Sequence, residues 1–479
     1  MAHLSHVPVG AFALDRFESL LHPGAYEELV EAQERAADIL HGRVVWNVNS
    51  TAKGGGVAEM LQSLLAYSRG AGIDARWVVI DGNDDFFRVT KRIHNHLHGA
   101  PGDGGPLGRA ERDAYESTLE SNADELTELI EPDDVVILHD PQTAGLIPPV
   151  RTTDAAIIWR CHVGLDRPTE LSRHAWDFLR EDVAQANAFV FSREAFAWEG
   201  LDTARVRVIP PSIDAFSPKN QSLEPHVVDA ILARANLLGG DADGDRTFLR
   251  EDGSPGRVDR EAEKFEGAPP PPPADARIVT QVSRWDRLKD PVGVIRSFAA
   301  QVAPTSDAHL VMAGPAVQAV ADDPEGIEVL NESRRAWEGL ETDARERIHL
   351  VALPMLDAQE NAAIVNALQR RSQVVVQKSL AEGFGLTVAE AMWKARPVVA
   401  SRIGGIQDQI ADGRSGVLLD DPTDPQEFGA AVLGLLGDPE SARRMGDEAQ
   451  ARVRADFLPS RHLGQWVQLI ASVLDGRRA

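Results

Sequence analysis

The stretch Val374-Val-Val-Gln-Lys-Ser-Leu-Ala-Glu-Gly-Phe-Gly-Leu-Thr-Val-Ala-Glu390 decides the fold of this chain. Its apolar beginning, Val374–Gln377, is typical of a buried strand, and a glycine-bearing turn leads from it into a helical pattern that continues to Trp393. The N–H groups of a helix's first turn have no partners inside the helix, so this strand, turn and helix together predict an anion-binding site. Two carboxylates, Glu382 and Glu390, flank that site.

The same residues also have a purely structural interpretation. Thr387-Val-Ala-Glu390 matches a capping box, in which Glu390 would only close the start of the helix. Glu382 could then be an ordinary loop acid. Taken alone, the stretch favours neither interpretation, and residues elsewhere in the chain have to decide between them.

The composition is that of a globular protein, and we expect it in the cytoplasm. The 479 residues are 43% hydrophobic and 26% charged, enough for roughly two or three domains. No apolar run approaches the ~18 residues of a membrane span, and no secretory signal is visible. The single cysteine, Cys161, fits a reducing compartment. The net charge of −25 argues against a nucleic-acid or membrane partner, so a pocket for an anion must be locally basic.

Two series of strands alternating with helices define the fold class. The first series begins with the strand Val44–Val48, the glycine turn Gly54-Gly55-Gly56 and a helix with apolar residues at helical spacing. The second series begins at Arg277–Val282. Apolar strands alternating with helices indicate parallel sheets that are covered on both faces. We therefore predict an α/β protein with two doubly wound, Rossmann-like domains facing across a cleft, with ligands at the carboxyl ends of the strands.

The predicted domain boundaries follow the break between the two series. Residues 1–215 form the N-terminal domain and residues 277–455 the C-terminal domain. A helix with an apolar stripe at 456–479 is expected to pack back on the N-terminal domain. Residues 216–276 are predicted to be a linker with a mobile insertion, because Gly239–Gly267 is polar and Pro269–Pro273 favours an extended spacer.

Several polar residues follow predicted strands, where such folds place ligands. Arg284 and Lys289 come after the first strand of the second series, and two cations there can neutralise a diphosphate leaving group without a metal. His162 and Asp140 follow strands of the first series, although a histidine at a strand end is more often structural than catalytic. The glycine turn allows a ligand to approach closely, but it is not the G-x-G-x-x-G of a nicotinamide site.

No metal site is predicted. His94 and His98 have the spacing of two ligands on one helical face, with His96 between them, but no acid is clearly in register. The stretch Asp241–Asp245 begins like a calcium loop, but Arg246 then stands where a glycine is needed.

The glycine turn, His162, Arg284, Lys289 and the two glutamates form an ordered set. This set resembles that of the retaining nucleotide-sugar glycosyltransferases of family 4, which have the two-domain GT-B fold. Further stretches resemble the trehalose-forming synthases of that family, which join nucleotide-activated glucose to free glucose. The resemblance spans roughly 43–216 and 276–455, and its stretches are Trp46–Glu59, Val89–Asn95, Leu138–Gln142, Trp159–His162, Pro210–Asp214, Thr280–Asp286 and Glu382–Pro397.

The resemblance implies a nucleotide-sugar-binding C-terminal domain and an acceptor-binding N-terminal domain. Glu382, His162, Arg284 and Lys289 would form the catalytic set, with the two cations on the distal phosphate and His162 orienting the transferred sugar. Glu390 would hold the ribose of the donor. The remaining donor-site residues would be Gly55, Gly56, Phe384, Gly385 and Leu386. The acceptor site would comprise Asn49, Lys91, His94, Asn95 and Asp140.

The leading hypothesis is therefore an enzyme that moves glucose from ADP-glucose or UDP-glucose to free glucose with retention, forming α,α-trehalose. The departing phosphate oxygen would take the acceptor's proton, so neither a dedicated base nor a metal or other cofactor is expected. The expected partners are these small molecules, and neither nucleic acid nor membrane is expected to bind. A homodimer is one of the assemblies that we consider.

Two alternatives stay open. The same donor chemistry could serve a sugar phosphate or glycerate as acceptor, which should require basic residues such as Lys53, Lys91 or Arg92 in the N-terminal domain. A non-catalytic sugar-nucleotide sensor is the second alternative, and the complete set of motif residues argues against it.

Overall fold

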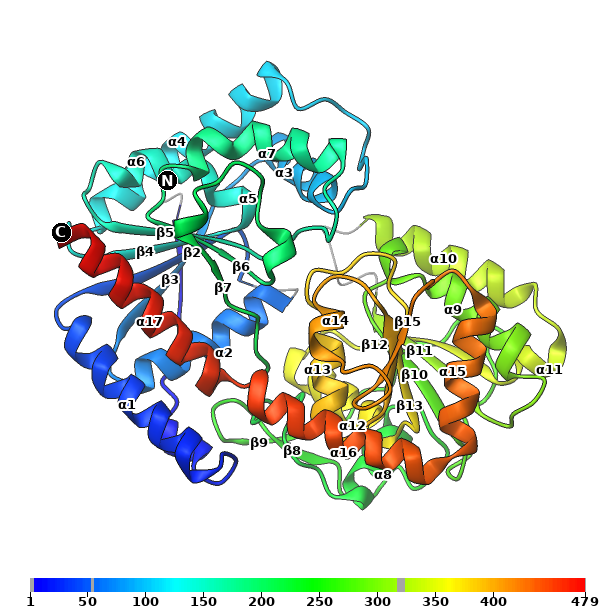
Figure 1. Cartoon of the computed structure of the whole chain (residues 1–479). Helices are drawn as coiled ribbons and strands as arrows, with labels where there is room; N and C mark the ends of the chain where they lie inside the picture. Colours follow the sequence, from blue (N-terminus) through cyan, green and yellow to red (C-terminus); the bar gives the residue numbers. More distant parts are fainter. Residues whose placement is uncertain (1–3, 53–55, 317–323, 479) are drawn as a thin grey trace. The chain divides into compact units, whose positions relative to one another are not determined.

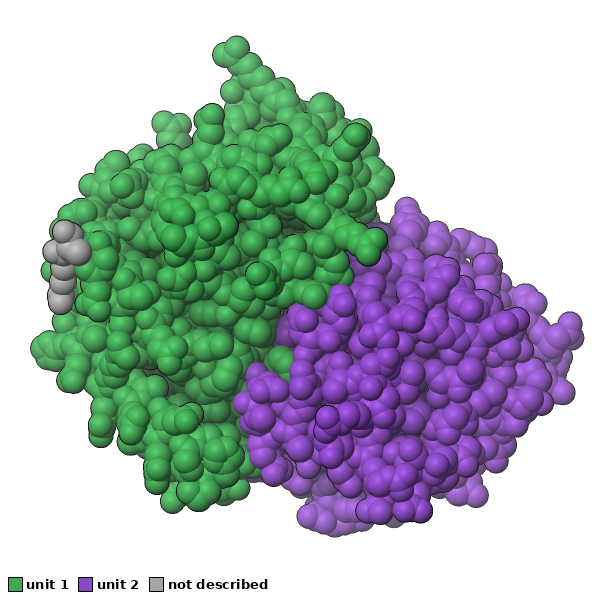
Figure 2. All heavy atoms as spheres, viewed as in Figure 1, with its two compact units in different colours: residues 1–212, 457–479 green, residues 213–456 purple. Residues whose placement is uncertain are grey.

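The computed structural model describes residues 4–52, 56–316 and 324–478. In this part of the chain the two series of strands form two mostly parallel sheets (Figure 1). Each sheet is the centre of a compact unit, and Figure 2 colours the two units differently. The first unit comprises Met1–Ser212 and Phe457–Ala479, and the second comprises Ile213–Asp456.

The sheet of the first unit reverses its strand order once. Its strands are β1 (Leu4–Val7), β2 (Val44–Asn49), β3 (Asp74–Ile80), β4 (Val135–His139), β5 (Ala156–Cys161), β6 (Ala188–Phe191) and β7 (Val206–Val208). Their order is β1-β3-β2-β4-β5-β6-β7, and β1 is antiparallel to β3 while the other neighbours are parallel. The reversal falls between β2 and β4, and open α/β sheets bind ligands at the carboxyl ends of such strands.

Helices cover both faces of this first sheet (Figure 1). They are α1 (Pro23–Ile39), α2 (Gly56–Gly70), α3 (Asp84–Leu97), α4 (Arg109–Leu129), α5 (Asp140–Thr143), α6 (Ile147–Arg151), α7 (Glu170–Val183) and α17 (Pro459–Arg478). Trp46 and Val48 of β2 belong to the core cluster that α3, α4 and α7 share. Val45 and Asn47 of the same strand lie on the opposite face, together with side chains of α2 and α17. Side chains of a strand alternate between the faces, so a strand covered on both sides is apolar almost throughout.

The last helix, α17, packs against α1 and α2 and so belongs to the first unit, although it follows the whole second unit in sequence. The Arg461 side chain donates to the carbonyl groups of Pro210 and Pro211, at 2.9 and 3.0 Å. The Ser212 hydroxyl lies 2.9 Å from Nδ1 of His462. These contacts join the segment that leaves the first unit to the helix that returns to it.

The second sheet is parallel throughout. Its strands are β10 (Ile278–Val282), β11 (His309–Pro315), β12 (Ile348–Leu353), β13 (Val374–Gln377), β14 (Val398–Ser401) and β15 (Val417–Leu419). Their order is β12-β11-β10-β13-β14-β15, which is the Rossmann arrangement with its reversal between β10 and β13. The loops after β10 and β13 therefore flank the point where such sheets bind ligands.

Helices also cover both faces of the second sheet. They are α8 (Pro225–Arg234), α9 (Pro291–Ser297), α10 (Pro324–Glu338), α11 (Thr342–Arg345), α12 (Ala358–Arg371), α13 (Leu386–Trp393), α14 (Ile406–Gln409), α15 (Pro425–Gly437) and α16 (Pro439–Asp456). One core cluster joins Val279 and Met312 to α9, α10 and α15. Another joins Ile278 and Val311 to α8 and α12 on the opposite face.

Residues 216–276, predicted to be a linker with a mobile insertion, are instead a folded part of the second unit. Helix α8 packs on α12, and a hairpin of β8 (Thr247–Leu249) and β9 (Pro255–Arg257) places Phe248 in the same core cluster. Glu263 exchanges two backbone hydrogen bonds with Ala352 of β12, at 2.8 and 2.9 Å. The segment thereby pairs with the edge of the sheet, which polar composition alone does not reveal.

The charged residues of this segment also have structural partners. Glu360 of α12 is buried and accepts hydrogen bonds from the backbone N–H groups of Asp259 and Arg260, at 2.7 and 2.8 Å. The Arg260 side chain forms an ion pair with the same carboxylate. In the part of the chain that the structure describes, no helix has the length and apolar character needed to cross a membrane.

Candidate active site

The loops that follow β10 and β13 bring two of the predicted site residues together. The Leu380 N–H group donates to the Leu288 carbonyl at 2.7 Å, which ties one loop to the other. Lys289 from the first loop and Glu382 from the second form an ion pair. The Ser379 hydroxyl also donates to Glu382, at 3.3 Å. A cation and an acid thus lie side by side where the strand order reverses.

Arg284 lies in the loop after β10, and 51% of its side chain is exposed. Its guanidinium forms an ion pair with Asp286 at 3.5 Å. Lys378, which the sequence did not single out, is buried and paired with Asp290 at the start of α9. Arg284 and Lys289 are therefore the predicted cations that an anion can reach, whereas Lys378 stabilises the loop.

The start of α13 differs from the predicted capping box. The N-cap is Gly385, whose φ of +83° is a left-handed conformation that favours glycine. Thr387 lies inside the helix, and its hydroxyl donates to the Gln377 side chain at 3.4 Å. The capping-box interpretation of Thr387 and Glu390 is therefore wrong, and Glu390 lies one turn into the helix. Phe384, Gly385 and Leu386 form the turn that presents the first N–H groups of α13.

Gly404, in the loop after β14, fixes the backbone of Glu382. A Cβ atom at Gly404 would lie 1.9 Å from the Glu382 carbonyl oxygen, and its φ of +47° is also left-handed. The neighbouring Gly405 N–H group donates to the Gly383 carbonyl at 2.8 Å. Three loops of the second sheet thus converge on the backbone that carries Glu382.

Glu390 is buried, and its two carboxylate oxygens have different surroundings. Oε1 lies 3.7 Å from Nζ of Lys219. Oε2 has no hydrogen-bond partner among the described residues. Buried carboxylate oxygens are usually satisfied, so an unpaired one is suited to accept a hydrogen bond from a ligand hydroxyl. No sequence motif includes Lys219, because it lies in the segment that is predicted to be a linker.

In the first unit, His162 belongs to a buried chain of polar groups. Its Nε2 lies 3.2 Å from Nδ1 of His139, and Nε2 of His139 lies 3.1 Å from Oδ1 of Asn47. Arg160 Nε lies 3.5 Å from Nδ1 of His162. Oδ1 of Asp140 accepts the His162 backbone N–H group at 2.7 Å. The structure thus brings His162 and Asp140 together, as neighbours at the strand ends.

These hydrogen bonds assign one tautomer to His162 and one to His139. Arginine only donates, so Nδ1 of His162 accepts and its Nε2 carries the proton. Nδ1 of His139 then accepts, and its Nε2 donates to the Asn47 carbonyl oxygen. Burial lowers the pKa of His139 to about 3 and that of His162 well below its ordinary value, so both rings are neutral near pH 7. Because its ring nitrogens face protein groups, a contact of His162 with a sugar stays a prediction.

The other predicted acceptor-site residues lie in two places in the first unit. Asn49 is buried, and its side chain accepts from Nε1 of Trp77 at 2.8 Å and donates to the Thr51 carbonyl at 2.6 Å. Lys91, His94 and Asn95 lie on α3, which packs against the short helix that begins at Asp140. Gly55 lies outside the described residues, and Gly56 is the first residue of α2.

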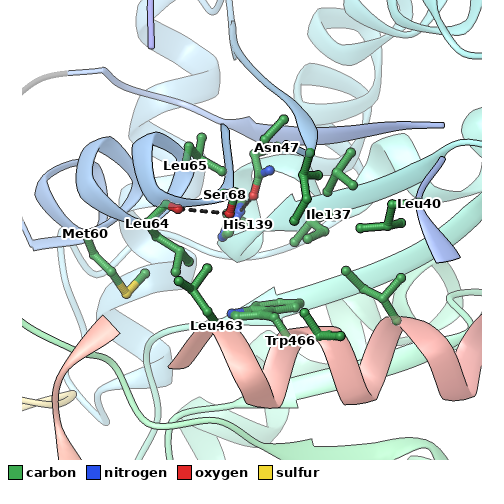
Figure 3. Close-up of a pocket in the computed structure, with 15 residues that line it drawn as sticks. Leu40, Asn47, Met60, Leu64, Leu65, Ser68, Ile137, His139, Leu463 and Trp466 are labelled. Atoms are coloured by element: carbon green, nitrogen blue, oxygen red, sulfur yellow. Dashed lines mark hydrogen bonds between the residues drawn. The ribbon is translucent and has the colours of Figure 1, made fainter. Parts of the chain in front are cut away.

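An apolar cavity of about 40 Å³ lies on the opposite face of the first sheet, between α2 and α17 (Figure 3). Its lining includes the polar residues Asn47 and His139 and the apolar residues Leu64 and Trp466. Figure 3 shows the hydrogen bond between Asn47 and His139 in this lining. Its lining suits helix packing behind the histidine pair and not the binding of a sugar.

The described residues contain no group of three or more metal-ligating side chains. The rings of His94 and His98 lie 4.9 Å apart in an edge-to-face arrangement.

Comparison with known proteins matches both units. The family described as "Trehalose synthase, N-terminal domain" matches residues 47–198, and the family described as "Glycosyl transferases group 1" matches residues 263–452. Trehalose synthase of Rubrobacter xylanophilus is 35% identical, over 98% of this chain and 99% of that protein. Trehalose synthase of Pyrococcus horikoshii is 33% identical, over 97% of each chain.

The solved structures bear on the fold. An α,α-trehalose-phosphate synthase (UDP-forming) from Burkholderia xenovorans, in complex with glucose-6-phosphate, has a TM-score of 0.65 at 15% identity. The alignment covers 91% of this chain and 100% of that chain. The two Rossmann-like sheets and the matched domains define a hexosyltransferase with the GT-B fold. The chain belongs to the trehalose synthase family of glycosyltransferases and acts in trehalose metabolism, so the predicted family and fold class are confirmed.

Proposed function

We propose that this enzyme transfers glucose from a nucleotide diphosphate glucose to free glucose with retention, forming α,α-trehalose. One observation carries the proposal: Lys289 is paired with Glu382 beside the first turn of α13, where the strand order of the second sheet reverses. A cation next to a helix N-terminus suits a diphosphate, and an adjacent carboxylate suits sugar hydroxyls.

The donor occupies the second unit in this proposal. Lys289 and Arg284 bind the distal phosphate, together with the first N–H groups of α13. The ammonium group of lysine has three N–H donors, so Lys289 can contact a phosphate oxygen and keep its bond to Glu382. Glu382 accepts hydrogen bonds from the transferred glucose, and Oε2 of Glu390 accepts one from the ribose.

The transfer needs one bond to form as another breaks. The acceptor hydroxyl attacks the anomeric carbon from the side on which the diphosphate departs, so the configuration is retained. The bond from the anomeric carbon to the phosphate oxygen breaks, and that oxygen takes the acceptor's proton. Lys289 and Arg284 stabilise the negative charge that develops on the departing diphosphate. ADP-glucose and UDP-glucose are the proposed donors, with no metal required.

Free glucose is the proposed acceptor, and the surroundings of Arg92 remove one of the three cations that a phosphate-bearing acceptor could use. A phosphate-bearing acceptor calls for an available cation in the first unit. Arg92 is buried and donates two hydrogen bonds to Asp103, at 2.6 and 2.8 Å. Lys53 lies outside the described residues, and Lys91 is exposed on α3. The geometry of Arg92 thus gives no support to a sugar phosphate, which is the alternative acceptor.

The test is direct. Purified protein is incubated with glucose and with ADP-, UDP- or GDP-glucose, and the product is identified by NMR. We expect α,α-trehalose and the matching nucleoside diphosphate, with undiminished turnover in the presence of EDTA. Glucose 6-phosphate and glycerate serve as the competing acceptors. A phosphorylated disaccharide formed faster than trehalose would reject the proposed acceptor while keeping the donor chemistry.

A further inference from the structure

The carboxylate of Glu390 faces a lysine that no motif of the sequence includes. Nζ of Lys219 lies 3.7 Å from Oε1 of Glu390, and 21% of the lysine side chain is exposed. The carboxylate itself is 95% buried at its side chain. Oε2, the other oxygen, has no hydrogen-bond partner among the described residues. One oxygen thus faces a protein cation, and the other is left for a different partner.

The backbone around Lys219 is held by several hydrogen bonds. The neighbouring Asn220 is 3% exposed, and its carbonyl oxygen accepts from Nε1 of Trp393 at 3.1 Å. Oδ1 of Asn220 accepts from Nζ of Lys394 at 2.8 Å. The Pro218 carbonyl accepts from the Asn366 side chain at 3.0 Å. These contacts fix the start of the 216–276 segment against α12 and α13, so the position of Lys219 is set by the fold.

A second lysine near Glu390, Lys394, forms different contacts. Lys394 lies one turn after Glu390 on the same helix, and its Nζ donates to the Glu390 backbone carbonyl at 3.0 Å. The same Nζ donates to the Asn220 side chain. Both partners are neutral oxygens, so Lys394 joins α13 to the segment that carries Lys219. The charge of Lys394 also attracts the Glu390 carboxylate, whereas Nζ of Lys219 lies within ion-pair distance of Oε1.

We propose that Lys219 is a positioning residue of the donor site: it holds Oε1 of Glu390 so that Oε2 accepts a hydrogen bond from a ribose hydroxyl of a nucleoside diphosphate. This inference rests on the proposed function. An ionised carboxylate only accepts hydrogen bonds, so its ligand must supply hydrogen-bond donors, and the vicinal diol of ribose supplies two. The pair with Lys219 also offsets the desolvation of a buried carboxylate.

Binding of ADP and UDP, measured by calorimetry, tests the inference without turnover. Lys219→Met keeps the length of the side chain and removes its charge. We expect Lys219→Met to weaken nucleotide binding about tenfold, which is the scale of one hydrogen bond to a charged group. This loss is measured on whichever of ADP and UDP the wild type binds more tightly. The 2′,3′-dideoxy form of that nucleotide should bind wild type weakly and be unaffected by the substitution. Lys219→Arg should restore most of the affinity.

Kinetics and a double mutant separate positioning from other roles. Lys219→Met should raise KM for the donor about tenfold and leave kcat within about twofold, since the ribose is remote from the reacting carbon. In a Glu390→Gln background, Lys219→Met should have no further effect, because the two residues act as one unit. Lys264→Met, at a partly buried lysine of the same unit, is the matched control and should bind like wild type.

The possible outcomes divide clearly. Unchanged binding in folded Lys219→Met, or equal loss for the ribose and dideoxy nucleotides, would overturn the role of Lys219 and leave the proposed function intact. A loss that persists in the Glu390→Gln background would also overturn it, because Lys219 would then act without Glu390. If wild type binds neither nucleotide and forms no disaccharide, the proposed function itself fails. Thermal melting of each variant shows whether the protein compared is folded.

Discussion

At the scale of single residues, Lys289 donates to Glu382 while its ammonium group retains further N–H donors. The pair is mostly buried, so its charges are poorly screened by solvent. Such a preorganised donor stabilises a developing negative charge without first having to reorient, which is the property that a diphosphate leaving group requires.

Lys289→Ala is expected to lower kcat/KM for the donor about 30- to 1000-fold, which corresponds to ~2–4 kcal/mol of transition-state stabilisation. The free energy of unfolding should also fall by ~1–3 kcal/mol, because the mostly buried Glu382 loses its cation and keeps the hydrogen bond from Ser379. Steady-state kinetics and thermal melting measure the two effects. Arg287→Ala is the control: this exposed arginine of the same loop pairs with glutamates of α10 and should leave kcat/KM unchanged. Wild-type kinetics in Lys289→Ala would refute the phosphate role.

Asp140 supplies a prediction about pH. Burial raises the pKa of its carboxyl group from 3.8 to about 7. Below 3.8 the folded and unfolded chains both hold this proton. Between 3.8 and 7 only the folded chain keeps it, so the contribution of Asp140 to the free energy of unfolding falls as pH rises through this window.

Asp140→Asn removes this titration and keeps an oxygen for the His162 N–H group. The free energy of unfolding of the variant should therefore rise relative to wild type from about pH 4 to about pH 7, and the difference should be constant above that range. Urea denaturation of both proteins at several pH values measures it. A difference that does not change with pH would mean that the carboxyl group titrates normally in the folded protein.

At the scale of elements, the 216–276 segment shows what sequence patterns miss. Its glycines, prolines and charges predict a spacer, because few apolar residues are available to bury. The structure satisfies those charges through distant partners, such as Arg260 with Glu360 of α12. Local composition does not contain that information. Deleting Gly239–Gly267, harmless for a mobile insertion, should instead destabilise the second unit.

A point substitution tests the same element more finely. Arg260→Ala leaves the buried Glu360 carboxylate without its cation, although two backbone N–H groups still donate to it. We expect a loss of ~1–3 kcal/mol in the free energy of unfolding of the second unit. Arg257→Ala, which breaks an exposed pair with Asp259, should change it by no more than ~0.5 kcal/mol. Chemical denaturation gives both values, and equal effects would contradict the structural role of Glu360.

The elements around the donor loops were more predictable. The strand Val374–Gln377 and the helix that follows were expected from an apolar run and helical spacing, and β13 and α13 occupy those residues. The capping box was wrong because Gly385, with its left-handed backbone, starts the helix before Thr387. Three-residue spacing alone cannot distinguish an N-cap from a position inside the helix, since the distinction lies in the backbone angles.

At the scale of the whole molecule, family membership and fold class followed from short ordered motifs, because each motif falls at a strand end where a doubly wound sheet gathers its loops. The partners of those motif residues did not follow. Lys219 meets Glu390, and Asn47 meets His139, only through folding of distant parts of the chain.

Removing residues 457–479 is expected to affect the two units differently. Helix α17 packs on α1 and α2 and walls the cavity above Asn47 and His139, so its loss exposes apolar surface of the first unit. Hydrogen exchange followed by mass spectrometry should show faster exchange in α1, α2 and β2, with the second sheet unchanged. Equal acceleration in both units would show instead that their stabilities are coupled.

The return of α17 to the first unit also has a consequence for protein synthesis. A ribosome makes Ile213–Asp456 before it makes the helix that completes the first unit. The second unit is continuous in sequence and can fold as it emerges from the ribosome. The apolar surfaces of α1 and α2 in the first unit stay uncovered until α17 has been made. This uncovered surface is where a chaperone would bind the growing polypeptide, and a chain that stops before Pro459 lacks the helix that covers its earliest-made part.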